Sequence, residues 1–222
     1  MSSRQRLPGS AIALIAGAFT FGAAEADASA GNLFLYSPVG PGQGESVFGV
    51  GGRVYLFIPT FDLHYVRGLT DYLDLYFDLN SLVVINQVDL GLRARLVGDA
   101  SSRFSMALKA AANPTFLFLK FRDAEPVSFA ATPGIVFGFG GPTTQFTVGF
   151  DLPIYFGSAG FAAGESGAPP GSKVQLVGRP NIGVEWRVGD SANMYIQASS
   201  LIGFSDSVSD FVGPIVGIGA AG

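Results

Sequence analysis

The chain of 222 residues contains no cysteine and only one histidine, His64. The absence of cysteine excludes disulfide frameworks, thiolate metal sites, cysteine nucleophiles and an acylated lipoprotein cysteine. Only 14% of the residues are charged and the formal net charge is -4, so the chain has no cluster of lysine and arginine that could follow a phosphate backbone. We therefore expect no nucleic acid partner, and no cofactor-binding motif or metal-ligand cluster is recognisable.

Long apolar runs are also missing, because no window after residue 30 offers eighteen uninterrupted apolar residues. A membrane-spanning helix is therefore excluded. Yet 48% of the residues are hydrophobic, with 31 glycines and 20 phenylalanines, and the mean hydropathy is +0.39. Contact with lipid would explain this composition, and the other structure that satisfies its backbone in hydrocarbon is a closed β-barrel.

The N-terminal region reads as an export signal. Two arginines precede an apolar run at 11–24, which is too short to span a membrane as a helix, and Ala28-Ser29-Ala30 offers small residues for cleavage. We assign residues 1–30 to a signal peptide, 31–45 to a flexible periplasmic lead-in and 46–222 to a barrel domain.

The strongest pattern in the remaining chain is an alternation of apolar and polar residues with period two, which predicts β-strands. In Tyr72–Leu79 every second residue is apolar and the residues between are tyrosine or aspartate. We predict ten strands, within a range of eight to twelve, at Val47–Phe57, Phe61–Arg67, Tyr72–Leu79, Val88–Leu96, Arg103–Ala111, Ser128–Phe139, Gln145–Phe156, Val174–Val188, Ala192–Gly203 and Phe211–Gly219.

Tight and longer connections alternate along the chain. The tight turns are Gly68–Asp71, Gly98–Ser102, Gly140–Thr143 and Gly189–Ser191. The longer connections are Asn80–Val83, Ala112–Val127, Gly157–Lys173 and Ser205–Asp210, of which the region 157–172 is rich in Gly, Ala, Pro and Ser. This alternation predicts an all-β, antiparallel, up-and-down transmembrane barrel with its tight turns and both ends in the periplasm.

The charged face of each strand must point into such a barrel, because an arginine or lysine facing lipid costs roughly 2 to 4 kcal/mol at the bilayer centre. Six acidic and six basic residues are then expected to form a lumen charge network: Arg53, Asp62, Asp74, Asp78, Asp89, Arg93, Arg95, Lys109, Asp151, Arg179, Glu185 and Arg187. The balance of signs favours a packed or narrowly hydrated lumen over a selective pore. A secreted soluble barrel or sandwich, with the apolar face inside, remains the alternative fold.

The run Tyr65–Leu75 resembles a hairpin of small Gram-negative outer-membrane β-barrel proteins, in which a Gly-Leu-Thr-Asp turn leads into Leu-Asp-Leu. The resemblance implies the barrel fold and no catalytic residues. Members of that group usually end on an aromatic residue that assists recognition by the assembly machinery. This chain ends Gly217–Gly222 instead, which leaves the register of the last strand open.

His64 and Asp62 share one predicted face near the expected outer end of their strand, and an Asp-His pair at a barrel rim could serve a hydrolase or acyltransferase. A lumen histidine within a polar network is the simpler interpretation, and no serine with nucleophile-elbow spacing accompanies it. The sequence thus predicts a monomeric structural barrel or narrow passive channel of the outer membrane. Its expected partners are membrane lipid and, during biogenesis, periplasmic chaperones and the barrel-assembly machinery.

Overall fold

The computed structural model describes residues 34–55, 58–81, 85–99, 101–117, 127–156, 175–189, 192–203 and 212–222. The expected signal peptide and the 157–172 connection lie outside these ranges. The described residues form eleven strands: β1 (Ser46–Tyr55), β2 (Ile58–Thr70), β3 (Leu73–Ser81), β4 (Ile85–Val97), β5 (Phe104–Leu117), β6 (Val127–Gly140), β7 (Thr144–Asp151), β8 (Ile154–Phe156), β9 (Gln175–Arg187), β10 (Asn193–Gly203) and β11 (Val212–Ala221). They contain no helix that is long and apolar enough to cross a membrane.

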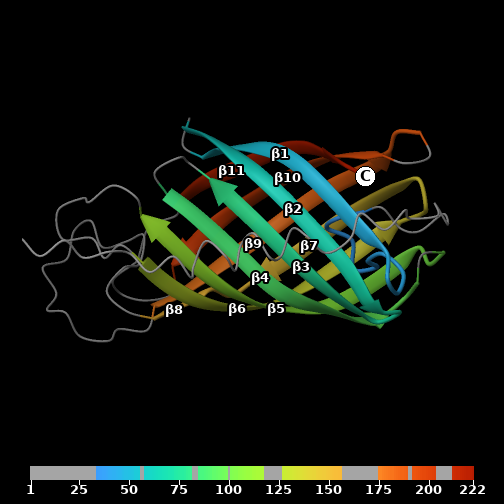
Figure 1. Cartoon of the computed structure of the whole chain (residues 1–222), viewed down its shortest axis with the longest axis horizontal. Helices are drawn as coiled ribbons and strands as arrows, with labels where there is room; N and C mark the ends of the chain where they lie inside the picture. Colours follow the sequence, from blue (N-terminus) through green and yellow to red (C-terminus); the bar gives the residue numbers. More distant parts are fainter. Residues whose placement is uncertain are drawn as a thin grey trace, which may run out of the picture.

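The strands close into one antiparallel barrel (Figure 1). Neighbours in sequence pair with each other around the ring, and β11 closes it by pairing with β1 from Gly49↔Ala221 to Tyr55↔Ile215. Strands β7 and β8 both lie between β6 and β9, so they are two parts of one strand and the barrel has ten. The break falls at Leu152 and Pro153, where proline has no N–H to donate to the ladder. The predicted fold class and strand number are confirmed.

Each predicted strand overlaps an observed one, and the main difference lies in β5. The alternation was expected to end at Ala111, whereas β5 continues to Leu117 and pairs with β6 as far as Phe116↔Val127. Asn113 and Thr115 are buried in this extension, and the Thr132 hydroxyl donates to the Asn113 side-chain oxygen. Polar residues facing the interior therefore prolong the hairpin where the apolar pattern weakens.

The tight turns all lie at one end of the barrel, together with the C-terminus (Figure 1). Gly222 exchanges both backbone hydrogen bonds with Phe48, so the pairing that β11 makes with β1 continues through Gly222. In the turn between β4 and β5, Gly98 has φ of 82°, a conformation that glycine adopts without steric cost. Hydrogen bonds from the Ser101 and Ser102 hydroxyls lower the pKa of Asp99 to about 2.

The barrel wall is apolar on its outer face and polar on its inner face, which is the reverse of the arrangement in a soluble barrel. Large hydrophobic side chains such as Leu90, Ile182 and Ile218 are about half exposed on the outside. Among the described residues sixteen polar or charged side chains are buried, against eleven hydrophobic ones. The wall therefore turns its polar face to the lumen.

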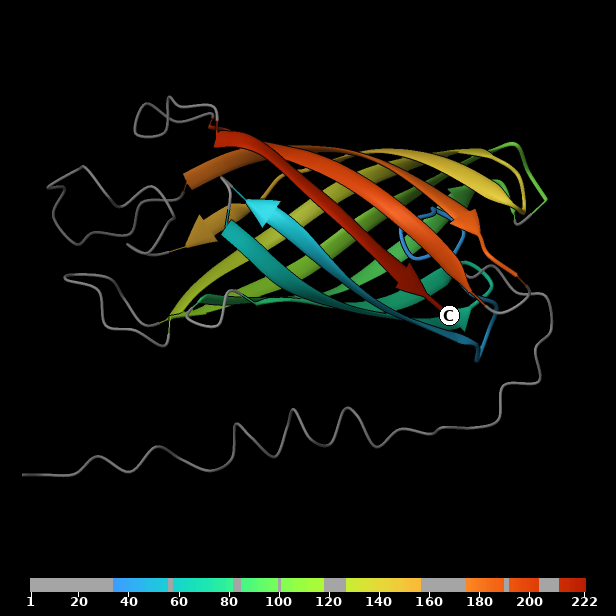
Figure 2. The same ribbon diagram turned by 90° about the horizontal axis from the view of Figure 1, so that it is seen from above.

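Residues 34–42 lie inside the barrel, at the end that carries the tight turns (Figure 2). Phe34, Leu35, Ser37 and Val39 are each at most 4% exposed. The expected lead-in at 31–45 therefore lies partly within the lumen, where the polar wall and its own apolar side chains hold it. We call residues 34–42 the lumen segment.

Candidate functional site in the barrel lumen

The buried charges of the wall form ion pairs between different strands. The side-chain N–O distances are 2.8 Å for Arg53–Asp62, 3.0 Å for Arg93–Asp74, 2.8 Å for Lys109–Asp151, and 3.2 and 3.7 Å from Arg179 to Asp151 and Asp89. Opposite charges that leave water are tolerated only when they are paired in this way. The structure thus brings most of the predicted lumen charges together as complementary pairs.

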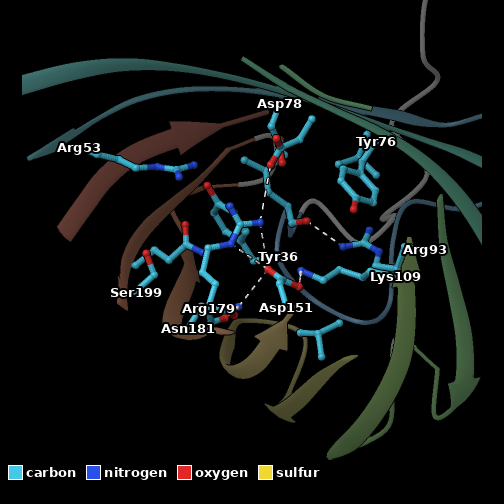
Figure 3. Close-up of a pocket in the computed structure, with 15 residues that line it drawn as sticks. Tyr36, Arg53, Tyr76, Asp78, Arg93, Lys109, Asp151, Arg179, Asn181 and Ser199 are labelled. Atoms are coloured by element: carbon cyan, nitrogen blue, oxygen red, sulfur yellow. Dashed lines mark hydrogen bonds and ion pairs between the residues drawn. The ribbon is translucent and has the colours of Figure 1, made fainter. Parts of the chain in front are cut away.

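Arg179 connects the two sides of the lumen. It lies on β9, hydrogen-bonds Asp151 on the neighbouring β7, and approaches Asp89 on β4, which is not a neighbour of β9 in the ring. Lys109 reaches Asp151 from β5 across β6, and the strand between them carries Gly134, where a Cβ would overlap the Asp151 carboxylate. Figure 3 shows Lys109 and Arg179 converging on Asp151. These contacts tie four strands together through the interior.

A small cavity remains beside these pairs. Its volume is about 70 Å³, enough for several waters. Seven predicted network members line it: Arg53, Asp78, Asp89, Arg93, Lys109, Asp151 and Arg179. With four basic and three acidic side chains, the lining has no dominant sign.

The other five predicted network members lie elsewhere in the barrel. Asp62, Asp74 and Glu185 are buried, at 5% exposure or less. Arg95 lies at the tight-turn end, where it donates to the Asp71 carbonyl oxygen and covers the Tyr72 ring at 5.0 Å. Arg187 ends β9 at the same side of the barrel.

His64 lies in the middle of β2 and is 1% exposed. Its Nδ1 lies 2.7 Å from the Asp78 carboxylate and its Nε2 lies 2.9 Å from the Tyr36 hydroxyl. The predicted partner, Asp62, binds Arg53 and Asn80 instead. The alternative of an Asp62–His64 pair at the rim does not fit these contacts, because the residue directly opposite on the neighbouring strand is closer than the one two positions along. The simpler interpretation, a lumen histidine within a polar network, describes the observed contacts.

The contacts of His64 define one hydrogen-bond chain. An ionised carboxylate only accepts, so the Nδ1–H of His64 donates to Asp78. In the neutral ring, Nε2 then accepts from the Tyr36 hydroxyl. The Tyr36 and Tyr195 rings meet the imidazole edge-on, with centroids 5.4 and 5.7 Å away. This arrangement orients the imidazole and fixes Tyr36, as a structural histidine would.

The lumen segment contributes contacts that the sequence analysis missed. Arg93 Nη1 donates to the Leu35 carbonyl at 2.8 Å, and the Tyr36 N–H donates to Glu185 Oε1 at 2.7 Å. The Ser37 hydroxyl donates to Gln145 Oε1 at 2.8 Å. The sequence feature that could have revealed these contacts is the apolar and aromatic run at the start of the segment, because a linker surrounded by water would not need such residues.

No group of three or more histidine, aspartate or glutamate residues in the described part of the chain is arranged to hold a metal ion.

No known family model and no curated protein matches the chain. Among solved structures, the N-terminal β-barrel domain of OprF from Pseudomonas aeruginosa is similar, with 11% sequence identity and a TM-score of 0.37. The match covers 81% of this chain and 97% of that domain. At this identity and TM-score it assigns no function.

Proposed function

We propose that the chain is an exported outer-membrane β-barrel with a structural role and, at most, a narrow passive route for small solutes. The observation that carries this proposal is the reversed wall, with hydrophobic side chains outside and charged ones inside. The exposed charged residues among those described, Asp71, Asp99 and Arg103, all belong to the tight-turn end. Among the described residues the outer surface carries no exposed charge between the two ends of the barrel, which suits hydrocarbon and is unfavourable in water.

Aromatic side chains supply a second, independent support. Phe129 and Phe139 are exposed on β6, and Phe146 and Phe156 are exposed on β7 and β8. The members of each pair are ten residues apart, which is about 33 Å along a strand. At a tilt of about 45° this gives about 23 Å along the barrel axis, close to the apolar band of about 25 Å between aromatic girdles in such barrels.

Members of the two pairs also meet each other across neighbouring strands. The rings of Phe139 and Phe146 lie 6.5 Å apart near the tight turns, and those of Phe129 and Phe156 lie 6.2 Å apart near the other end. In this proposal the two aromatic groups mark the two membrane surfaces. The tight turns and the C-terminus face the periplasm, and the protein is a monomer whose partners are lipid and, during biogenesis, periplasmic chaperones and the assembly machinery.

Passage through the lumen should be slight. The lumen segment occupies one end, and Arg179 bridges opposite walls. In planar bilayers we expect the full-length protein to give no conductance steps, or small ones with weak ion selectivity, because the charges of the lining balance. Large, strongly selective steps would contradict this role.

A further inference from the structure

We propose that the tight-turn end of the lumen is a peptide-binding site whose occupant is the chain's own lumen segment, and that departure of this segment opens the lumen. The first part concerns the folded barrel alone. The second part rests on the proposed membrane function.

The barrel wall is hollowed where the segment lies. At Gly49 on β1, an added Cβ would overlap the Leu35 side chain. At Gly138 on β6, it would lie 2.7 Å from Pro38 and 2.6 Å from the Ser105 hydroxyl. Glycine at these two inward positions gives the segment room that side chains would otherwise fill.

Two ionisable side chains of the wall are directed at the peptide backbone of the segment. Arg93, 3% exposed, binds the Leu35 carbonyl, and Glu185, fully buried, accepts from the Tyr36 N–H. Such bonds recognise the peptide backbone itself, and a buried polar group without a partner is costly. The Tyr36 hydroxyl on His64 and the Ser37 hydroxyl on Gln145 then add side-chain recognition.

The connection between the segment and β1 is a turn at the barrel rim. Gly44 has φ of 83°, its N–H binds the Gly68 carbonyl at 2.9 Å, and the Gly68 N–H binds the Glu45 carbonyl at 3.0 Å. This turn is anchored to β2 independently of the contacts made deeper in the lumen. The segment can therefore leave while every strand pairing stays in place.

Departure of the segment would join the cavity to the tight-turn opening. Leu35 and Tyr36 form part of the cavity lining, together with Lys109, Asp151 and Arg179. Without them, the water that fills the cavity becomes continuous with the solution at that end. The side chains of Lys109, Asp151 and Arg179 would then be hydrated by this water.

The first test measures whether the site is occupied. The chain has no cysteine, so Ser37→Cys and Ser101→Cys place single thiols at a fully buried site of the segment and at an exposed turn. In the folded, detergent-solubilised protein, a water-soluble maleimide should label position 37 at least about tenfold more slowly than position 101, because labelling requires local opening. Equal rates in the folded protein, with equal rates in denaturant, would overturn the proposal.

The second test measures opening and recognition in the full-length protein and a variant lacking residues 34–42. In planar bilayers the deletion should give conductance steps at least severalfold larger than any step of the full-length protein, and the synthetic peptide Phe-Leu-Tyr-Ser-Pro-Val-Gly-Pro-Gly, added on the tight-turn side, should lower them again. A scrambled peptide is the control.

Insertion of both proteins with identical conductance, or equal block by both peptides, would overturn this inference and leave the barrel assignment intact. Failure of the full-length protein to enter bilayers would instead contradict the proposed function, and the labelling result decides occupancy even if the deletion variant does not fold.

Discussion

Leu90→Arg should lower the free energy of unfolding by roughly 2 to 4 kcal/mol when the barrel is folded in lipid vesicles, because the guanidinium would face hydrocarbon near the bilayer centre. Leu90 lies near the middle of β4 and is 49% exposed on the outer face. The measurement is a denaturant titration followed by the fluorescence of the single tryptophan, Trp186.

The matched control for this substitution is Leu69→Arg. Leu69 is also exposed, at 39%, but it lies at the tight-turn end of β2, where an arginine should cost only about 0 to 1 kcal/mol. The difference between the two positions reports depth in the bilayer. Equal, small effects within about 0.5 kcal/mol would fit an outer face in water and would contradict the membrane assignment.

Arg93→Met should cost about 3 to 5 kcal/mol, because it leaves Asp74 as a buried carboxylate without its partner. The two side chains are 4% and 7% exposed, so water cannot replace the guanidinium without rearrangement. The substitution also removes the donor to the Leu35 carbonyl. The same lipid-vesicle titration measures the loss.

Two further variants isolate the ion pair. Combining Arg93→Met with Asp74→Asn removes the buried charge and should recover part of the lost stability, since replacing both partners is far less costly than removing one. Arg103→Met removes an exposed arginine at a turn and should change stability by less than about 0.5 kcal/mol. If Arg93→Met were as mild as Arg103→Met, the buried pair would contribute nothing to the barrel.

The barrel itself could be predicted from the sequence because its evidence is local and repeated. Alternation in a strand such as Leu73–Ser81 assigns each side chain to a face, and the positions of the tight turns fix the order of the strands. Pairing across the hairpin that turns at 68–71 also places Asp78 opposite His64 in the structure. The break at Pro153 left the pattern intact, so one continuous strand was predicted there.

Contacts across the lumen could not be predicted in the same way. Which carboxylate Arg179 binds depends on the curvature and stagger of the closed barrel, which bring β4 and β9 within reach of one side chain. The position of the lumen segment depends on the hollow that Gly49 and Gly138 leave in the wall. Neither property is visible as a periodicity of the sequence.

The central claim, that this chain is an outer-membrane barrel, is tested most directly by cell fractionation combined with gel mobility before and after boiling. We expect the protein to sediment with outer membranes, to need detergent to dissolve, and to change its mobility when boiling unfolds the barrel. A protein that stays in the aqueous phase without detergent and shows the same mobility before and after boiling would contradict it.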